Sequence, residues 1–409
     1  MSLKQYYTTH NYLPLLLIAF LLPFNFGVAI VLVISLITFF ALGNVKAGMK
    51  ALVANKWTYV FLLFFFLHAL GYFFSDNKKE AITAIEIKLG FIAFPLLLFT
   101  QEFNRIDIRK VLRFFAYGTV ACTLFNVVRA FYFYLFQHES KYLFYSEFSF
   151  FMHPGYFAMY CVFSIMILSV LGINYFKAAK HNVLLVIMCC LVLALGVFMS
   201  ASKMGMLSLF VLLPVLLFYV LFKRKKYILL AAIIVLVSIS SFFVLITDFA
   251  PVQRLRNAFD FAGSGKAIDK TTSESNAVRV LIWNEAATII KNNLLLGVTP
   301  GDANDALYTA YEKNGMTGAL EKHLNAHNQF LQTTLGTGII GGILLVFLTV
   351  GILVAGFTRK EVILVLFGLI ITINFLVESM LQTQAGTLFF VFLASILLVN
   401  TGNVNKRYL

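Results

Sequence analysis

Residues 339–356 read Ile-Ile-Gly-Gly-Ile-Leu-Leu-Val-Phe-Leu-Thr-Val-Gly-Ile-Leu-Val-Ala-Gly, an apolar segment without a charged residue. As an α-helix, about 20 such residues cross the ~30 Å hydrocarbon core of a bilayer. Similar segments recur along the 409-residue chain, which is 60% hydrophobic and only 12% charged. Because soluble domains carry about a quarter charged residues, this composition excludes a soluble enzyme, a disordered chain and a disulfide scaffold. It predicts an all-α integral membrane protein.

Polar breaks between the apolar runs predict about twelve transmembrane helices. We expect them near residues 11–24, 26–43, 57–74, 82–100, 110–136, 154–173, 182–200, 204–222, 227–247, 328–356, 360–377 and 384–401. A tight re-entrant turn is an alternative to the first hairpin, because only residues 23–27 separate its two helices. No cleavable signal peptide is expected, since Lys4 is the one positive charge in residues 1–10 and no small-residue cleavage site follows.

Lysine and arginine residues in the short loops set the expected orientation. Eighteen of them fall on the side that holds both termini, and four fall on the opposite side: Lys78, Lys79, Lys141 and Lys203. The positive-inside rule therefore predicts that both termini are cytoplasmic. This loop bias accounts for the whole formal charge of +14, so no nucleic-acid partner is expected.

One long polar segment, residues 248–327, separates the ninth and tenth predicted helices. About eighty residues is long for a connection without structure of its own, so we expect a folded periplasmic loop that caps an active site. This divides the chain into helices 1–9 (1–247), the loop (248–327) and helices 10–12 (328–409). Apolar spacing predicts short helices over 276–287, with Asn276 as N-cap, and over 303–311, with a turn at 294–301.

The end of this loop carries a distinctive motif. Ala326-His327-Asn328-Gln329-Phe330-Leu331, followed by Gly336, Gly338 and Ile339-Ile340-Gly341, resembles the His motif of the O-antigen ligase and O-antigen polymerase superfamily of bacterial lipid-linked glycan transferases. Val278-Arg279 with Trp283 and Leu295-Leu296-Gly297 resembles the family's Arg, Trp and Pro-Leu-hydrophobic-Gly stretch, although Asn293 and Leu294 stand where Pro is usual.

Three shorter segments are also similar to this family. Ser200-Ala201-Ser202-Lys203 resembles its Ser-Arg motif, with a lysine that keeps the charge but lacks the bidentate fork of arginine. Residues 151–156 and 381–386 are similar to members from one bacterial branch. Together with the topology, the resemblance covers nearly the whole chain.

The resemblance implies a membrane glycosyltransferase on the periplasmic face of a bacterial inner membrane. Its donor would be a glycan on undecaprenyl diphosphate, and membrane lipids would surround it. In a ligase of lipopolysaccharide biosynthesis the acceptor is a sugar hydroxyl of lipid A-core, whereas in a polymerase it is another lipid-linked repeat. The family's ligases are metal-independent and invert the anomeric carbon, so neither a metal nor a cofactor is expected.

Cations near the outer surface are candidates to stabilise the departing diphosphate, which gains negative charge during transfer. They are Lys203, Arg279, Lys88 and Arg129. Lys88 and Arg129 lie within predicted spans, where an ionisable group is costly and suggests a site. As alternatives, Lys88 pairs with Glu86 or snorkels to the interface, Arg129 anchors the aromatic residues 131–134, and Arg279 is an ordinary surface arginine.

His327 is the candidate general base, because a histidine can take a proton from a sugar hydroxyl at neutral pH. The alternative is a helix cap or surface residue. His323 lies four residues earlier, so the pair could ligate zinc on one helical face. We do not favour this alternative, because the glutamate of a metalloprotease motif is missing and no third ligand is evident.

Other polar residues extend the expected substrate site. Asn328 belongs to the His motif, and His153 and Tyr156 either line the acceptor entrance or belong to an interfacial aromatic belt with a proline at a helix start. Glu378 could orient a cation or His327, although a solvated helix end is the favoured interpretation. We expect Trp283 to pack the loop helix onto the bundle, with sugar contact as the alternative.

Two further functions stay open at this level. A polymerase shares every residue above with a ligase, and overall likeness alone favours the ligase. A polytopic transporter or flippase is common at this length, but such proteins often contain two similar halves and broken helices around a midplane site. The sequence shows neither an evident repeat nor a charged midplane cluster.

Overall fold

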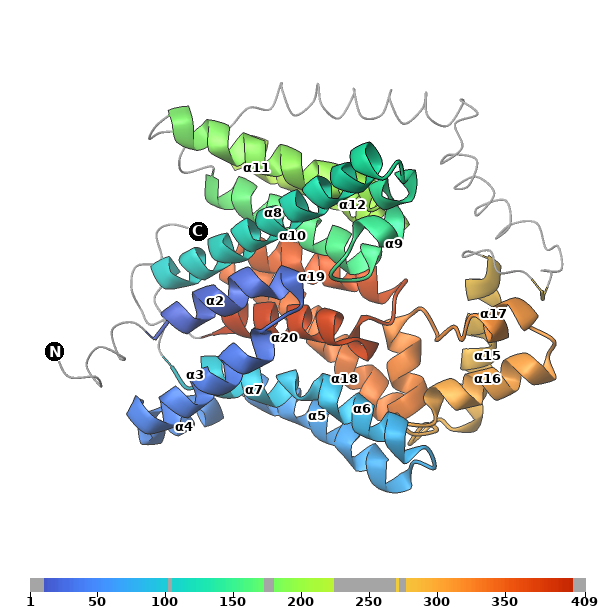
Figure 1. The fold of residues 1–409 in the computed structure, drawn as a ribbon. Helices are drawn as coiled ribbons and strands as arrows, with labels where there is room; N and C mark the ends of the chain where they lie inside the picture. The colour runs from blue at the N-terminus through green and yellow to red at the C-terminus, as the bar shows by residue number, and fades with distance from the viewer. Residues whose placement is uncertain (1–10, 102–104, 173–179, 224–269, 272–276, 400–409) are drawn as a thin grey trace.

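The computed structural model describes residues 11–101, 105–172, 180–223, 270–271 and 277–399. Every regular element in these residues is a helix. Long apolar helices pack into one bundle, and three short helices, α15 to α17, form a cap at one end of it (Figure 1).

The membrane bundle is built from thirteen described α-helices. They are α2 (Leu13–Leu21), α3 (Val28–Leu42), α4 (Val45–Ala54), α5 (Lys56–Phe74), α6 (Lys78–Lys88), α7 (Gly90–Leu98), α8 (Arg105–Phe136), α10 (Pro154–Gly172), α11 (Lys180–Met199), α12 (Lys203–Lys223), α18 (Gln329–Arg359), α19 (Val362–Phe375) and α20 (Gln384–Leu398). Short helical turns connect them: η1 (Leu22–Phe24), η2 (Ser140–Leu143), α9 (Tyr145–Phe148) and η4 (Met380–Gln382).

Six spans in the described part of the chain are long and apolar enough to cross a membrane: α5, α6 with α7, α8, α10, α12 and α18. The pair α3 and α4, bent by 118°, raises this number to seven if it counts as one span. Shorter apolar helices occur at four more predicted positions, and the ninth predicted span, 227–247, lies outside the described residues. The protein is therefore an all-α multi-pass membrane protein, and the total of twelve helices stays a prediction.

The first predicted hairpin differs from two full spans. With nine residues, α2 is too short to cross a ~30 Å hydrocarbon core alone. It passes into η1 at Pro23, which cannot donate a backbone hydrogen bond. The chain then turns through Asn25 (φ 50°) and Gly27 (φ 74°), both in the left-handed region, before α3 begins.

Helices α10 and α20 lie at the centre of the bundle, where nearly all their residues are buried. A helix that is apolar on every side requires such a position. Phenylalanine fills the space around them: Phe389 of α20 lies 5.9 Å from Phe163 of α10 and 6.0 Å from Phe367 of α19, measured between ring centroids. The Tyr160 hydroxyl donates to the Ala385 carbonyl at 2.9 Å, which joins the two central helices.

The cap consists of α15 (Ala277–Asn292), α16 (Ala303–Lys313) and α17 (Thr317–Glu321) and has a small core of its own. Helices predicted over 276–287 and 303–311 are confirmed, although Asn276 lies outside the described residues. Two buried side chains, Ile282 and Leu307, join α15 to α16 in this core. The Tyr311 hydroxyl donates to the Leu324 carbonyl at 3.1 Å and closes the cap beneath residues 322–328.

A break in α18 attaches the cap to the bundle. Gly338 adopts φ 67° and ψ −170° inside an otherwise helical segment. The backbone groups around the break pair with the predicted turn instead: Val298 N donates to the Leu335 carbonyl, and Ile339 N donates to the Leu294 carbonyl, both at 2.8 Å. Unpaired backbone groups are costly in an apolar environment, so this exchange stabilises the break.

A polar contact at the other end of the same turn holds it to the loop between α5 and α6. The Asp302 carboxylate accepts hydrogen bonds from the backbone N–H groups of Asp76 (3.0 Å) and Asn77 (2.8 Å) and from the Thr299 hydroxyl (2.7 Å). Burial by itself raises the pKa of Asp302, but these hydrogen bonds and the charge of Lys78 outweigh it, so the pKa lies below its usual value. The cap is thus fixed to two separate parts of the bundle.

Gly338→Ala tests the break. A Cβ atom at this position would overlap the Leu295 carbonyl, so we expect the free energy of unfolding to fall by about 2 kcal/mol or more. Gly315→Ala is the matched control, because Gly315 has a similar φ of 68° but no neighbour within 4 Å. Thermal unfolding of both purified variants in the same detergent gives the comparison. Equal losses in the two variants would contradict the role of the break.

Candidate active site

His327 lies in a tight turn just before α18. Its φ of 44° is in the left-handed region, and its backbone N–H donates to Asn325 Oδ1 at 2.9 Å. Asn328 caps α18 by accepting the Leu331 N–H at 3.1 Å, and its Nδ2 donates to the Leu376 carbonyl at 3.1 Å. The turn therefore joins the start of α18 to the segment that follows α19.

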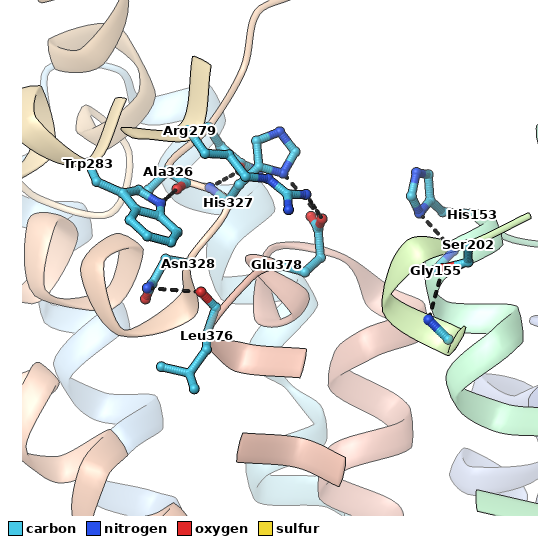
Figure 2. Close-up of polar contacts among 12 residues, drawn as sticks. His153, Gly155, Ser202, Arg279, Trp283, Ala326, His327, Asn328, Leu376 and Glu378 are labelled. Atoms are coloured by element: carbon cyan, nitrogen blue, oxygen red, sulfur yellow. Dashed lines mark hydrogen bonds and ion pairs between the residues drawn. The ribbon is translucent and has the colours of Figure 1, made fainter. Parts of the chain in front are cut away.

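Helix α15 lies against this turn. Trp283 Nε1 donates to the Ala326 carbonyl at 2.9 Å, which joins α15 to the segment that precedes α18 (Figure 2). Arg279 is four residues earlier, so it projects from the same face of α15. This spacing explains why an arginine and a tryptophan occur together in the sequence motif, since the tryptophan fixes the helix and the arginine extends into the site.

Glu378 contacts both His327 and Arg279. Its Oε2 atom lies 3.2 Å from His327 Nδ1 and 3.9 Å from an Arg279 guanidinium nitrogen (Figure 2). Only 17% of the Glu378 side chain is exposed, so the solvated helix end favoured from the sequence is wrong. The segment between α19 and η4 carries the carboxylate into the bundle, where it is covered by the cap.

The charges in this group affect one another. Burial by itself raises the pKa of the Glu378 carboxyl, but the hydrogen bond from His327 and the electrostatic interactions with His327, His153 and Arg279 outweigh it, so the pKa lies below its usual value. For Arg279, loss of hydration lowers the pKa, while Glu378 and Tyr145 act in the opposite direction. The carboxylate is therefore ionised at neutral pH.

His153 and Tyr156 approach the same group from the start of α10. His153 Nδ1 accepts the Gly155 N–H at 3.2 Å, and the two aromatic rings lie 5.7 Å apart. Partial loss of hydration lowers the pKa of His153, Glu378 opposes this shift, and the charges of His327 and Arg279 add to it. His153 is thus within electrostatic range of all three residues, although it stands on the other side of the group in Figure 2.

Lys203 begins α12 beside the same end of α10. The preceding Ser202 caps this helix, since its Oγ accepts the Gly205 N–H at 3.1 Å. Gly205 lies directly against Ala158 of α10, where any larger residue would overlap. This close approach of two helices places Ser202, the residue before the exposed Lys203, beside Gly155 and His153 at the start of α10 (Figure 2).

Two predicted cations are not in contact with this group. Arg129 donates to the Glu147 carbonyl at 2.6 Å and lies over aromatic rings of the loop between α8 and α10. Lys88 is fully buried, and its Nζ has no hydrogen-bond partner among the described residues, which excludes both snorkelling and a pair with Glu86. Helix α6, which carries Lys88, contacts η4 just after Glu378.

Sequence reasoning missed the role of Gln329. This buried side chain accepts the Leu381 N–H at 2.6 Å through Oε1 and so ties the start of α18 to η4. Its presence in the Ala326–Leu331 motif was the available signal. Within the described residues, no three or more His, Cys, Asp or Glu side chains gather as metal ligands would, and His323 instead contacts Tyr308.

Comparison with known proteins supports these observations. Residues 188–346 match the family model described as O-antigen ligase. Over these residues the chain is similar to the O-antigen ligase superfamily. Among curated proteins, no match is found. An O-antigen ligase domain implies glycan transfer of the ligase or polymerase type, with lipid-linked glycans as substrates.

The O-antigen ligase match covers only part of the group described above. It includes Lys203, Arg279, Trp283, His327 and Asn328. Lys88, Arg129, His153, Tyr156 and Glu378 lie outside it. Three-dimensional packing brings His153 and Glu378 close to the O-antigen ligase segment from helices on either side of it.

Glu378→Gln tests how much the ionised Glu378 carboxylate stabilises the folded protein at different pH values. Because the folded-state pKa of Glu378 lies below 4.5, its ionised form stabilises the folded protein above that pH, and the contribution is lost as pH falls through the lower folded value. Wild type should therefore unfold at a higher temperature than the variant at pH 7, and the gap should close below about pH 4.5. Exposed Glu312→Gln is the control. A gap that stays constant with pH would contradict this prediction.

Proposed function

We propose that the protein is an O-antigen ligase-type glycosyltransferase, which moves a glycan from undecaprenyl diphosphate to a sugar hydroxyl of lipid A-core. The observation that carries the proposal is the contact of Glu378 with His327 and Arg279, two residues that lie inside the region that matches the O-antigen ligase family. The site would face the periplasm, with both termini in the cytoplasm of a bacterial inner membrane. The excess of lysine and arginine in the opposite loops supports this orientation.

His327 is the general base of this proposal. With Nδ1–H donated to the Glu378 carboxylate, Nε2 is the free acceptor for the proton of the attacking hydroxyl. The carboxylate also stabilises the imidazolium that forms. The acceptor oxygen bonds to the anomeric carbon from the face opposite the diphosphate, the bond from that carbon to the phosphate oxygen breaks, and undecaprenyl diphosphate leaves with inversion and without a metal.

Arg279 and Lys203 hold the donor diphosphate in this proposal. Arg279 is 22% exposed, so its charge acts on a phosphate in partly dehydrated surroundings, where it is more effective than in water. Lys203 is exposed and follows Ser202, which lies beside the start of α10, so it is accessible to a lipid headgroup. The buried Lys88, whose Nζ has no hydrogen-bond partner among the described residues, lies on a helix that contacts η4 and could supply a further donor to the phosphate. Arg129 instead contacts the loop between α8 and α10, so the proposal does not include it among the diphosphate ligands.

His153 and Tyr156 form the acceptor side of the proposed site. They stand across from His327 and therefore suit a sugar whose hydroxyl must reach Nε2. Asn328 contributes by fixing the turn, since its side-chain Oδ1 and Nδ2 atoms both make hydrogen bonds within the protein. A polymerase of the same superfamily would use the same residues with a different acceptor, and the glycan profile below distinguishes the two.

His327→Ala should abolish transfer, because loss of a general base costs about 10²–10⁴ in rate. The measurement is the surface glycolipid profile of a deletion strain complemented with wild type or variant, by gel and mass spectrometry. His323→Ala is the matched control, since His323 lies in the same segment with a similar φ of 47°.

Long chains left on undecaprenyl diphosphate in the deletion strain would indicate a ligase, and a single-repeat cap on lipid A-core would indicate a polymerase. Near-normal transfer by His327→Ala would contradict its role. An unchanged profile on deletion would contradict lipid A-core as acceptor.

Arg279→Ala should raise the donor concentration needed for half-maximal rate by about tenfold or more, because a charge-assisted contact to the diphosphate is lost. The donor is lipid-linked glycan extracted from the deletion strain, added to purified protein. Lys291→Ala removes an exposed cation from the last turn of the same helix and serves as the control. An unchanged dependence on donor concentration would argue against diphosphate binding by Arg279.

A further inference from the structure

Three consecutive leucines are exposed in the turn between α15 and α16. The exposed fractions are 48% for Leu294, 70% for Leu295 and 78% for Leu296, and none of the three packs into the core of the cap. The preceding Asn292 and Asn293 are exposed as well, so the surface changes from polar to apolar at Leu294. Single exposed leucines are common, but a contiguous apolar patch indicates an interaction surface. We call residues 294–296 the leucine segment.

The backbone of the leucine segment is fixed against the break in α18. Ile339 N donates to the Leu294 carbonyl at 2.8 Å. The Leu295 carbonyl lies directly against Gly338, where a Cβ atom would overlap it. These contacts use backbone atoms, and the three leucine side chains stay on the outer surface. The depth of the leucine segment in a membrane is therefore set by the depth of Ile339.

The helix that follows the break has the length of a membrane span. From Ile339 to Arg359 it rises about 30 Å at 1.5 Å per residue, which matches the ~30 Å hydrocarbon core of a bilayer. Arg359 and Lys360 mark its end away from the cap, and no charged residue occurs in 339–358. By contrast, residues 329–337 contain two glutamines and three threonines. Ile339 therefore lies at the boundary of the hydrocarbon core on the side of the cap, and so does the leucine segment.

Helix α5 marks the same boundary beside the other end of the turn. Pro300 packs directly against Gly71, where a Cβ atom would overlap the proline ring. Phe73, two residues nearer to the end of α5, is 72% exposed. Lys78 Nζ donates to the Tyr72 carbonyl at 2.8 Å and lies 5.1 Å from the centre of the Tyr72 ring. Exposed aromatic side chains beside a lysine are typical of the membrane–water interface. Two helices from different parts of the chain thus place the turn at the same level.

We propose that the leucine segment inserts into the bilayer at the border between headgroups and acyl chains and so anchors the cap to lipid. The apolar surface continues on α18 directly after the break, where Ile340 is 49% exposed and Ile343 is 61% exposed. An interfacial segment buries its apolar side chains ~5–10 Å into this border. The pairing with α18 has already ordered the backbone, so the removal of three leucines from water is opposed by little further loss of entropy. The inference is independent of the proposed glycan transfer.

Photochemical crosslinking identifies what covers the leucine segment. Full-length protein with p-benzoylphenylalanine in place of Leu296 is illuminated in phosphatidylcholine proteoliposomes and analysed by gel and mass spectrometry. We expect a phospholipid adduct, as at the lipid-facing position of Ile343, and none at Glu312, which is exposed on α16 of the cap. A crosslink to a second copy of the chain without a lipid adduct would overturn the proposal. The absence of an adduct at 296 while 343 forms one would do the same.

Tryptophan fluorescence measures the depth of insertion. After subtraction of the wild-type signal, the fluorescence of Leu296→Trp should be quenched more by lipids brominated near the headgroup than by lipids brominated near the chain end. Phe347→Trp should show the reverse order, because Phe347 is exposed on α18 about 12 Å further along the helix from Ile339. Glu312→Trp should not be quenched by either lipid. Leu296→Trp fluorescence that behaves like Glu312→Trp would contradict insertion.

Hydrogen exchange tests the anchoring of the cap. In lipid nanodiscs, the combined change Leu295→Ser and Leu296→Ser should speed exchange of the α15 amides about fivefold, because the cap opens more readily without its lipid contact. Val280→Ser is the matched control, since it removes a partly exposed apolar side chain from the same helix at the end away from the leucine segment. Exchange at the wild-type rate in the double variant would show that the segment does not anchor the cap.

Discussion

The break in α18 is the constraint on which the rest of the site depends. A continuous helix would pair its own backbone groups at Leu335 and Ile339, and the turn at 294–301 would have no partner in the bundle. With Gly338 out of helical geometry, that turn pairs there and also reaches the loop after α5 through Asp302. The cap is held at two points, and Arg279 is placed over the start of α18, where His327 lies.

The attachment of the cap to the bundle also determines which charged side chains lie around Glu378. Glu378 is covered by the cap yet stays ionised, because the hydrogen bond from His327 and the positive charge of Arg279 stabilise its carboxylate. A carboxylate that hydrogen-bonds one imidazole nitrogen leaves the other nitrogen free to accept a proton, a combination that general-base catalysis requires. The same partly dehydrated surroundings strengthen the attraction between Arg279 and a phosphate. One packing arrangement therefore supports both halves of the proposed chemistry.

Arg129 illustrates how tertiary contacts change the meaning of a charged residue. From the sequence it was a membrane cation of uncertain role, either a phosphate ligand or an anchor among aromatic residues. The structure surrounds its guanidinium group with Phe133, Tyr142 and Phe150 from its own helix and the following loop. Lys88 shows the opposite outcome: it is buried and has no hydrogen-bond partner within the described part of the chain, which keeps a substrate-binding role as a hypothesis.

The sequence by itself determined the fold class, most membrane helices, the short helices of the cap, and Arg279, Trp283 and His327 as a group. These features depend on composition, on apolar spacing and on motifs within one stretch of chain, all of which are local. Only the tertiary structure decided that Glu378 is buried against His327, 51 positions away, and that His153 faces the same group. Exposure and contact between distant segments depend on how helices pack, and no local pattern encodes the neighbour that will cover a residue.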